Sequence, residues 1–239
     1  MPNILKSLTA GFLCLFFLSA CGYTGNPEVQ DHVYKAQLNT VQQAVDQFQK
    51  DTGVLPIKTR DQKTPLYQKY PIAFENRLIP KYLPDAPENA YMNGGLFEYV
   101  LVNAEKDPTV KVIDLTTVQV VQKLQRRVNF FEHQHHYTPT QGTIGPKRYK
   151  LYYKSLGYDQ PPYVKSPFTG YQLGFVVGPD SKVHIDYRKD LNAFMKKYRA
   201  SYKPGQDIRN ILVQHSPFVP VDSFPYTVNP SGDPVFLTK

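Results

Sequence analysis

The chain has 239 residues, of which 41% are hydrophobic and 13% aromatic, and this composition suits a packed core and excludes disorder throughout. The net charge is +8, and loss of residues 1–20 would remove only Lys6 and leave +7. The basic residues are scattered along the chain, which argues against nucleic acid as a partner and is typical of a solvated basic surface. Outside a cell, anionic lipid headgroups or anionic wall polymers would attract such a surface.

The N-terminal residues carry a targeting pattern. Lys6 precedes an apolar run from Leu8 to Leu18, which is short for a membrane span and is typical of a signal peptide. Ser19 and Ala20 then precede Cys21, and Leu-Ser-Ala-Cys-Gly resembles the bacterial lipobox. That resemblance implies cleavage after residue 20 and a diacylglyceryl group on Cys21. The alternatives are an ordinary secretory signal or an uncleaved anchor helix.

Lipidation would decide where the protein works. A diacylglyceryl group supplies two acyl chains, and two chains hold a protein stably on a membrane. We therefore expect a lipoprotein anchored to the extracytoplasmic face of the cell membrane. Residues 21–32 are predicted to be a flexible tether, because Gly25, Asn26 and Pro27 lie in a short polar stretch. Cys14 and Cys21 are the two cysteines of the chain, so no disulfide can stabilise the residues beyond Cys21.

Two segments have the apolar spacing of amphipathic helices, residues 33–50 and residues 117–134. They align without gaps at an offset of 83, and their apolar positions agree while their polar positions differ. The aligned pairs are Val41 with Leu124, Gln42 with Gln125, Val45 with Val128, Phe48 with Phe131 and Pro56 with Pro139. The agreement indicates an internal repeat.

Each predicted helix is followed by a proline-rich loop and then by a predicted hairpin. The first hairpin covers residues 96–115 and the second covers residues 172–187, since apolar and polar residues alternate on both sides of a polar turn. We therefore predict an α+β fold with two repeated units, residues 33–116 and residues 117–198. In each unit an amphipathic helix packs on a small antiparallel sheet.

Residues 199–239 are predicted to be a proline-rich arm. Six prolines exclude long helices, and regularly spaced apolar residues favour an extended segment lying on the two units over a disordered tail. A third short helix is expected before the arm, at residues 190–198, where Leu191, Phe194 and Met195 recur at helical spacing.

Four phrases carry a family resemblance: Phe48–Thr59, Tyr67–Pro71, Ser166–Gly170 and Tyr202–Arg209. In these phrases the chain resembles the YphF-type lipoproteins of bacilli and their relatives, some of which are labelled periplasmic-binding components of ABC transporters. The resemblance implies a Gram-positive membrane surface and supplies no catalytic residue. The predicted modules also resemble the soluble part of pilin-like proteins.

Candidate chemistry is sparse. His133, His135 and His136 are metal-ligating residue types, but their place at a predicted helix end favours a solvated terminus, so we predict no metal site. Asp186 and Asp190 form a carboxylate pair that acid–base catalysis could use, yet nothing else in the sequence singles them out. We expect no catalytic residue, no cofactor and no enzyme activity.

The most distinctive candidate for binding is a basic and aromatic stretch. It comprises Lys147, Arg148, Lys150, Tyr152 and Tyr153, a mixture that can pair with anions and stack on sugars. We interpret it first as a loop and strand of the second unit whose rings complete the core, and the alternative is a contact for an anionic wall polymer. The first functional hypothesis is a non-enzymatic binding or scaffold lipoprotein at the cell surface. Its partners would be the membrane and either an anionic wall polymer or another surface protein. The second is a solute-binding lipoprotein of an ABC transporter, with its ligand in the groove between the units.

Overall fold

The structure is a computed structural model that describes residues 27–238, with side chains from residue 34 onward. The predicted signal peptide and Cys21 lie outside the described residues. Helix α1 spans Pro27–Thr52, so residues 27–32, which we predicted as tether, are helical. Proline suits the first position of a helix, and acidic residues such as Glu28 are favoured near its N-terminus, which explains the earlier start. No helix of the described residues has the length and apolar composition of a membrane span.

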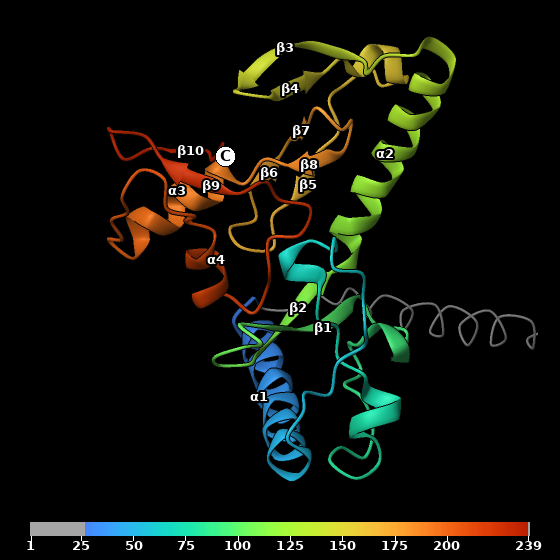
Figure 1. The fold of residues 1–239 in the computed structure, drawn as a ribbon, viewed down its shortest axis with the longest axis vertical. Coiled ribbons are helices and arrows are strands. Elements are labelled where there is room, and N and C mark those ends of the chain that lie inside the picture. The colour runs from blue at the N-terminus through green and yellow to red at the C-terminus, as the bar shows by residue number, and fades with distance from the viewer. Residues whose placement is uncertain (1–26, 239) are drawn as a thin grey trace, which may run out of the picture. The chain divides into compact units, whose positions relative to one another are not determined.

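Residues 37–239 form one compact unit, and all packing described below lies within it. Helices account for 34% of the chain and strands for 21%, the strands forming small antiparallel sheets. The predicted α+β class is confirmed (Figure 1).

The first half of this unit leads from α1 to a single hairpin, β1 Phe97–Val102 and β2 Thr109–Asp114. Between α1 and β1 the chain forms short turns of helix at η1 Leu66–Gln68, η2 Phe74–Leu78 and η3 Tyr91–Asn93. The hairpin is buried on both faces, because five of the six β1 residues are buried although successive side chains point to opposite sides.

The second half begins with helix α2, Leu115–His135, whose first turn is capped by the Asp114 side chain accepting a hydrogen bond from the Thr116 amide (2.9 Å). A four-stranded antiparallel sheet follows in the order β3-β4-β7-β8. Its strands are β3 Thr140–Gly145, β4 Arg148–Leu151, β7 Phe175–Val177 and β8 Val183–Ile185. The connections contain η4 Tyr153–Leu156 and a small pair of strands, β5 Val164–Lys165 and β6 Gln172–Leu173.

The two halves share details of their hydrogen bonding. Gln42 donates from its amide nitrogen to the Pro108 carbonyl (2.9 Å) and accepts from the Val110 amide (2.7 Å), so it holds the turn of the first hairpin. Gln125 does the same for the second hairpin, donating to the Ser181 carbonyl (3.0 Å) and accepting from the Val183 amide (2.7 Å). Both glutamines lie on the long helix that precedes their hairpin.

The helix ends and the strand order also agree. Gly53 and His136 end α1 and α2 with positive φ angles of 73° and 62°, and each amide donates to the carbonyl four residues earlier. Isolated bridges pair Ile57 with Ile72 and Pro71 with Val100. The first half therefore follows, in reduced form, the strand order of the four-stranded sheet.

The C-terminal region is more structured than predicted. It contains helix α4 Asn210–Gln214 and the hairpin β9 Tyr226–Val228 with β10 Pro234–Phe236, so residues 199–239 are not extended throughout (Figure 1). Ile211, Leu212 and Val213 are all buried, and this local run of apolar residues between prolines is enough for a short helix. Helix α3 Arg188–Lys197 occupies the place predicted for the third helix.

An extended part of this region joins both hairpins. Phe218 forms a parallel bridge with Val112 of β2, and Ser223 forms one with Ile185 of β8. The amide of Ile185 donates to the Asp222 carbonyl (2.9 Å). Residues 217–223 thus run along the edge of each hairpin in turn, and one hydrophobic cluster continues from Val100 and Ile113 through α2 to Leu212.

Candidate functional site

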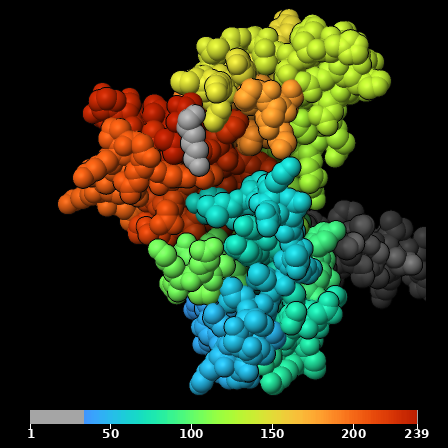
Figure 2. Space-filling model, viewed as in Figure 1, coloured from blue at the N-terminus to red at the C-terminus, as the bar shows by residue number. Residues whose placement is uncertain are grey.

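The candidate site is a cavity of about 700 Å³ lined by three separate segments. They are residues 66–70 around η1, residues 101–107 at the end of β1 and in its turn, and Asp207 with Asn210 before and in α4. Figure 2 shows the green turn of the first hairpin next to the orange and red C-terminal region and the cyan segment near residue 66. A volume of this size is typical of sites for small molecules.

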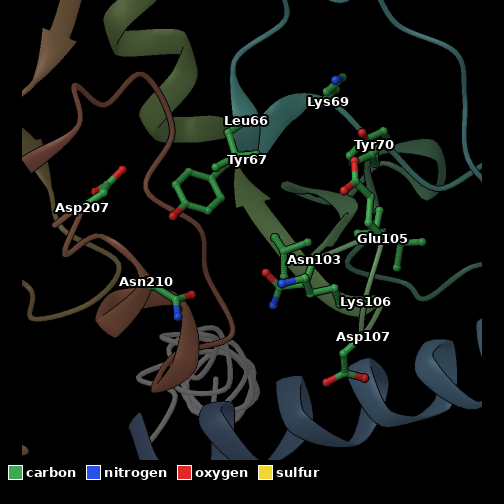
Figure 3. Close-up of a pocket in the computed structure, with 13 residues that line it drawn as sticks. Leu66, Tyr67, Lys69, Tyr70, Asn103, Glu105, Lys106, Asp107, Asp207 and Asn210 are labelled. Carbon is green, nitrogen blue, oxygen red and sulfur yellow. The ribbon is translucent and has the colours of Figure 1, made fainter. Parts of the chain in front are cut away.

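The η1 segment is fixed to the hairpin by backbone hydrogen bonds. The amide of Leu101 donates to the Tyr70 carbonyl (2.8 Å), and Arg60 donates from its guanidinium to the Gln68 carbonyl (3.0 Å). Pro65 precedes the single turn of helix and accepts from the Gln68 amide (2.9 Å). Tyr67 is therefore held in a defined place at the cavity wall (Figure 3).

The turn between β1 and β2 forms the opposite wall. Asn103 has a positive φ of 53°, a conformation that asparagine adopts more readily than most residues, and its carbonyl accepts from the amides of Lys106 and Asp107 (3.0 Å each). In Figure 3 the side chains of Asn103 and Lys106 reach toward α4, where Asn210 faces them. The turn thus presents an amide and an ammonium group to the cavity.

Asp207 and Asn210 form the third wall, and Arg209 holds Asp207 in place. Asp207 accepts from the Arg209 amide and from its Nε (3.1 Å each), and its second oxygen accepts from Nη2 (2.6 Å). The guanidinium of Arg209 lies 5.2 Å from the centre of the Tyr67 ring, a cation–π distance. These contacts join the C-terminal region to η1 across the cavity edge.

The electrostatics of the cavity suit binding. Burial raises the pKa of Tyr67 to about 12, an effect that Arg209 opposes and Asp207 reinforces. The phenol therefore stays protonated at neutral pH and can donate a hydrogen bond. Both signs of charge line the cavity, with Lys69 and Lys106 against three carboxylates. This arrangement can hold a polar molecule that carries both donors and acceptors, or both charges.

A smaller cavity of about 350 Å³ lies between the two predicted units. Gln68 donates to the Asp222 carboxylate at its edge (3.2 Å), and burial raises the pKa of Asp222. Arg60 and Glu98 pair at the same cavity (2.5 Å). Its polar groups are engaged with each other and its volume is half that of the first cavity, so the first cavity is the better candidate.

The predicted basic and aromatic stretch divides into two kinds of residue. Lys147, Lys150 and Tyr152 are exposed. Arg148 instead lies 3.7 Å from the centre of the Phe224 ring, and burial lowers its pKa. Tyr153 is half-buried against the core, and burial raises its pKa to about 12. Two of the five predicted contact residues therefore help to hold the fold together.

The other sequence candidates take structural positions. His133 and His135 lie in the last turn of α2, and His136 is its C-cap. Within residues 27–238 no three His, Cys, Asp or Glu side chains are grouped as metal ligands would be. Asp186 pairs with Arg188 (2.6 Å), and Asp190 accepts hydrogen bonds from two hydroxyl groups, so the predicted carboxylate pair is divided between separate contacts.

The cavity residues were not predicted as a site. One signal was present, because Tyr67 and Asp207 each belong to a phrase that carries the family resemblance, Tyr67–Pro71 and Tyr202–Arg209. The sequence around Asn103 and Lys106 indicated only a polar turn and nothing that pointed to a binding site. The phrases are 130 residues or more apart, and only the fold brings them to one cavity.

Residues 34–114 match the YphF family N-terminal domain. This range contains most of α1, the first hairpin and two of the three cavity segments, while Asp207 and Asn210 lie beyond it. No curated protein and no solved structure matches the chain. The resemblance to YphF-type proteins is confirmed over residues 34–114.

Proposed function

We propose that this YphF-type protein is a lipid-anchored extracytoplasmic protein that works as a binding or scaffold module and not as an enzyme. The anchor is Cys21, at the end of the lipobox-like sequence Leu18–Cys21. The observation that carries the binding role is the cavity of about 700 Å³ with its mixed charges. Its size and its convergent polar groups support recognition of a small polar molecule or of a partner's side chains.

The chemistry of the cavity favours binding over catalysis. Tyr67, with a pKa of about 12, holds its proton at neutral pH and is a poor base. Asp207 is occupied by a two-pronged contact with Arg209, which leaves it as a fixed acceptor. Groups that are fixed in this way position a ligand and do not need to exchange protons.

We further infer that residues 33–116 and 117–198 are copies of one ancestral unit. The matched roles of Gln42 and Gln125, and of Gly53 and His136, support the duplication, because both pairs keep the offset of 83 that aligns the helices. Residues 217–223 would then be an addition that joins the two copies by pairing with Val112 and Ile185.

The anchor is tested by replacing Cys21 with Ala in cells fed a clickable fatty acid. The wild-type protein is expected to carry the label and to remain with the membrane fraction. The variant should lose the label completely, because alanine offers no thiol for the thioether bond. The measurement is in-gel fluorescence of each cell fraction. A Cys14→Ala variant is the control, since this cysteine lies within the predicted signal peptide and should not affect labelling.

Two results would count against this proposal. An unlabelled wild-type protein in the culture medium would indicate an ordinary secretory signal. An unlabelled protein of full length in the membrane would indicate an uncleaved anchor helix. Either result would reject the lipid anchor. Neither result would bear on whether the cavity binds a ligand.

The second candidate function is that of a solute-binding lipoprotein of an ABC transporter. The observation that favours it is again the cavity volume, which suits a free small molecule. The cavity lies between the first half and the C-terminal region, and not in the groove between the two predicted units that the sequence suggested.

A thermal-shift panel of amino acids, sugars and short peptides tests this candidate. A cognate solute at 100 times its Kd should stabilise the protein by about 2.7 kcal/mol and raise Tm by several degrees. Asn210→Ala should weaken that shift because Asn210 lines the cavity, whereas Gln214→Ala on the exposed side of α4 should not. A panel without any shift would reject solute binding and leave the scaffold role.

A further inference from the structure

Helix α2 has a basic stripe that the cavity does not use. Lys123, Arg127, Phe130 and Gln134 follow each other at intervals of three or four residues, so they lie on one face of the helix, with Arg126 beside them. All five are exposed. They line one side of a groove of about 480 Å³, and Ser155 and Leu156 of η4 line the other.

The groove is positively charged. Its nine lining residues include Lys123, Arg126 and Arg127 and no carboxylate. In the part of the chain that the structure describes, Lys123 and Arg126 form no ion pair, so their charges are available to a ligand. Arg127 is fixed, because it donates to the Leu156 carbonyl (2.6 Å) and lies 4.4 Å from the centre of the Tyr158 ring.

Phe130 adds an apolar contact to this charge. Its side chain is 66% exposed, although buried Val128 and Phe131 lie within one turn of it on a helix that has a well-formed apolar face. The core therefore does not require a phenylalanine at this position. An exposed ring between cations can pack against the carbon skeleton of a sugar or polyol whose phosphates pair with the cations.

The corresponding face of α1 lacks these features. At the offset of 83, Lys123 aligns with Thr40, Arg126 with Gln43 and Phe130 with Gln47, and Gln134 aligns with Asp51. Helix α1 packs on its hairpin and holds its turn in the same way as α2, without a basic stripe. The stripe is thus not needed for the fold, and its presence on one helix indicates a separate role.

We infer that this groove binds a linear polymer with repeated phosphodiester groups. The stripe from Lys123 to Gln134 extends about 16 Å along the helix, which suits several anions in a row better than one isolated anion. The inference rests on the proposed extracytoplasmic location, where such polymers would meet the protein. The surface that would contact such polymers is therefore the α2 groove, and not the stretch around Lys150.

The test uses the full-length protein in non-ionic detergent and fluorescent poly(glycerol phosphate). We expect binding that weakens as salt rises, since phosphate contacts release counterions. The double variant Lys123→Gln/Arg126→Gln should bind roughly tenfold more weakly at about 50 mM salt. The slope of its log affinity against log salt concentration should decrease by an amount that corresponds to about two phosphate contacts. Phe130→Ala should weaken binding severalfold without changing that slope.

Two double variants with the same loss of charge serve as controls. Lys196→Gln/Lys197→Gln on α3 changes an unrelated exposed pair, and Lys147→Gln/Lys150→Gln changes the site suggested by the sequence while leaving Arg148 in place. Both should bind within about twofold of wild type. Equal losses in all three variants would show that only net charge matters, and would overturn the inference.

Two other outcomes would also overturn it. The wild-type protein could fail to bind the polymer, or it could bind phosphatidylglycerol vesicles through Lys123 and Arg126 but not the polymer, which would identify a lipid surface as the partner. These results are independent of the anchor experiment. A protein that is labelled at Cys21 and does not bind poly(glycerol phosphate) would reject the groove alone.

Discussion

Replacing Asp190 with Ala is expected to lower the free energy of unfolding by about 3 kcal/mol, because it removes the acceptor of one buried and one partly buried hydrogen bond. Ser166 donates to one oxygen of Asp190 (2.7 Å) and Thr169 donates to the other (2.5 Å). Asp190 itself is fully buried. Urea denaturation followed by circular dichroism measures the change.

The expected loss of stability is large because the Ser166 and Thr169 hydroxyl groups have no other acceptor among the residues that surround Asp190. The Ser166 oxygen already accepts from the amides of Phe168 and Thr169, and the Thr169 oxygen accepts from the amide of Tyr171. In the variant the buried Ser166 hydroxyl and the partly buried Thr169 hydroxyl would both lose their acceptor. The loop at residues 166–171 should therefore loosen together with the start of α3.

The same carboxyl makes stability depend on pH. Burial raises the pKa of Asp190 above its ordinary value of 3.8, an effect that Thr169 and Ser166 oppose. The folded protein thus binds the proton more tightly than the unfolded chain, so the charged carboxylate costs stability above the raised pKa. That cost disappears as the pH falls from the raised pKa toward 3.8.

The Asp190→Asn variant separates charge from shape. It lacks the titrating group, so wild type should gain stability relative to this variant between pH 7 and about pH 4. Lys196→Ala, at an exposed position of the same helix, is the control and should change stability by less than about 0.5 kcal/mol. A difference in the free energy of unfolding between wild type and Asp190→Asn that stays constant across this pH range would contradict a raised pKa of Asp190.

Gln125→Ala is expected to destabilise the protein by about 2 kcal/mol, and Gln42→Ala by a similar amount, because each variant loses two hydrogen bonds to a hairpin turn. In both cases a backbone amide and a backbone carbonyl lose their partner at once. Thermal unfolding by calorimetry measures the loss. Hydrogen exchange should become faster at Val110 in one variant and at Val183 in the other.

Gln43→Ala is the matched control for this pair. Gln43 is the exposed neighbour of Gln42 and should change stability by less than about 0.5 kcal/mol. Similar losses of stability for the Gln42 and Gln125 variants would support the duplication, since the two residues would then stabilise the hairpin turn equally in both copies. A loss at one position and none at the other would contradict it.

Local pattern was sufficient to predict the main elements. Helical spacing in residues 33–50 and 117–134 identified α1 and α2, and alternation identified the hairpins at β1–β2 and β7–β8. These patterns are informative because each element buries one face, so its apolar residues recur at the period of a helix or of a strand. Strand β3 was not predicted, because residues 140–143 are all exposed and show no alternation, whereas a strand in the region of β4 was one interpretation of the basic and aromatic stretch.

The sequence by itself determined the α+β class, the order of helices and hairpins and the resemblance of residues 34–114 to the YphF family N-terminal domain, because those depend on residues close together in the chain. Tertiary structure alone decided the cavity between residue 67, the turn at Asn103 and Asn210, and the pairing of residues 217–223 with both hairpins. It also decided that Arg148 packs on Phe224, while Lys123 and Arg126 line the groove beside α2. The physical reason is that such contacts join distant segments, and their partners are set by how the apolar faces pack and not by any local pattern.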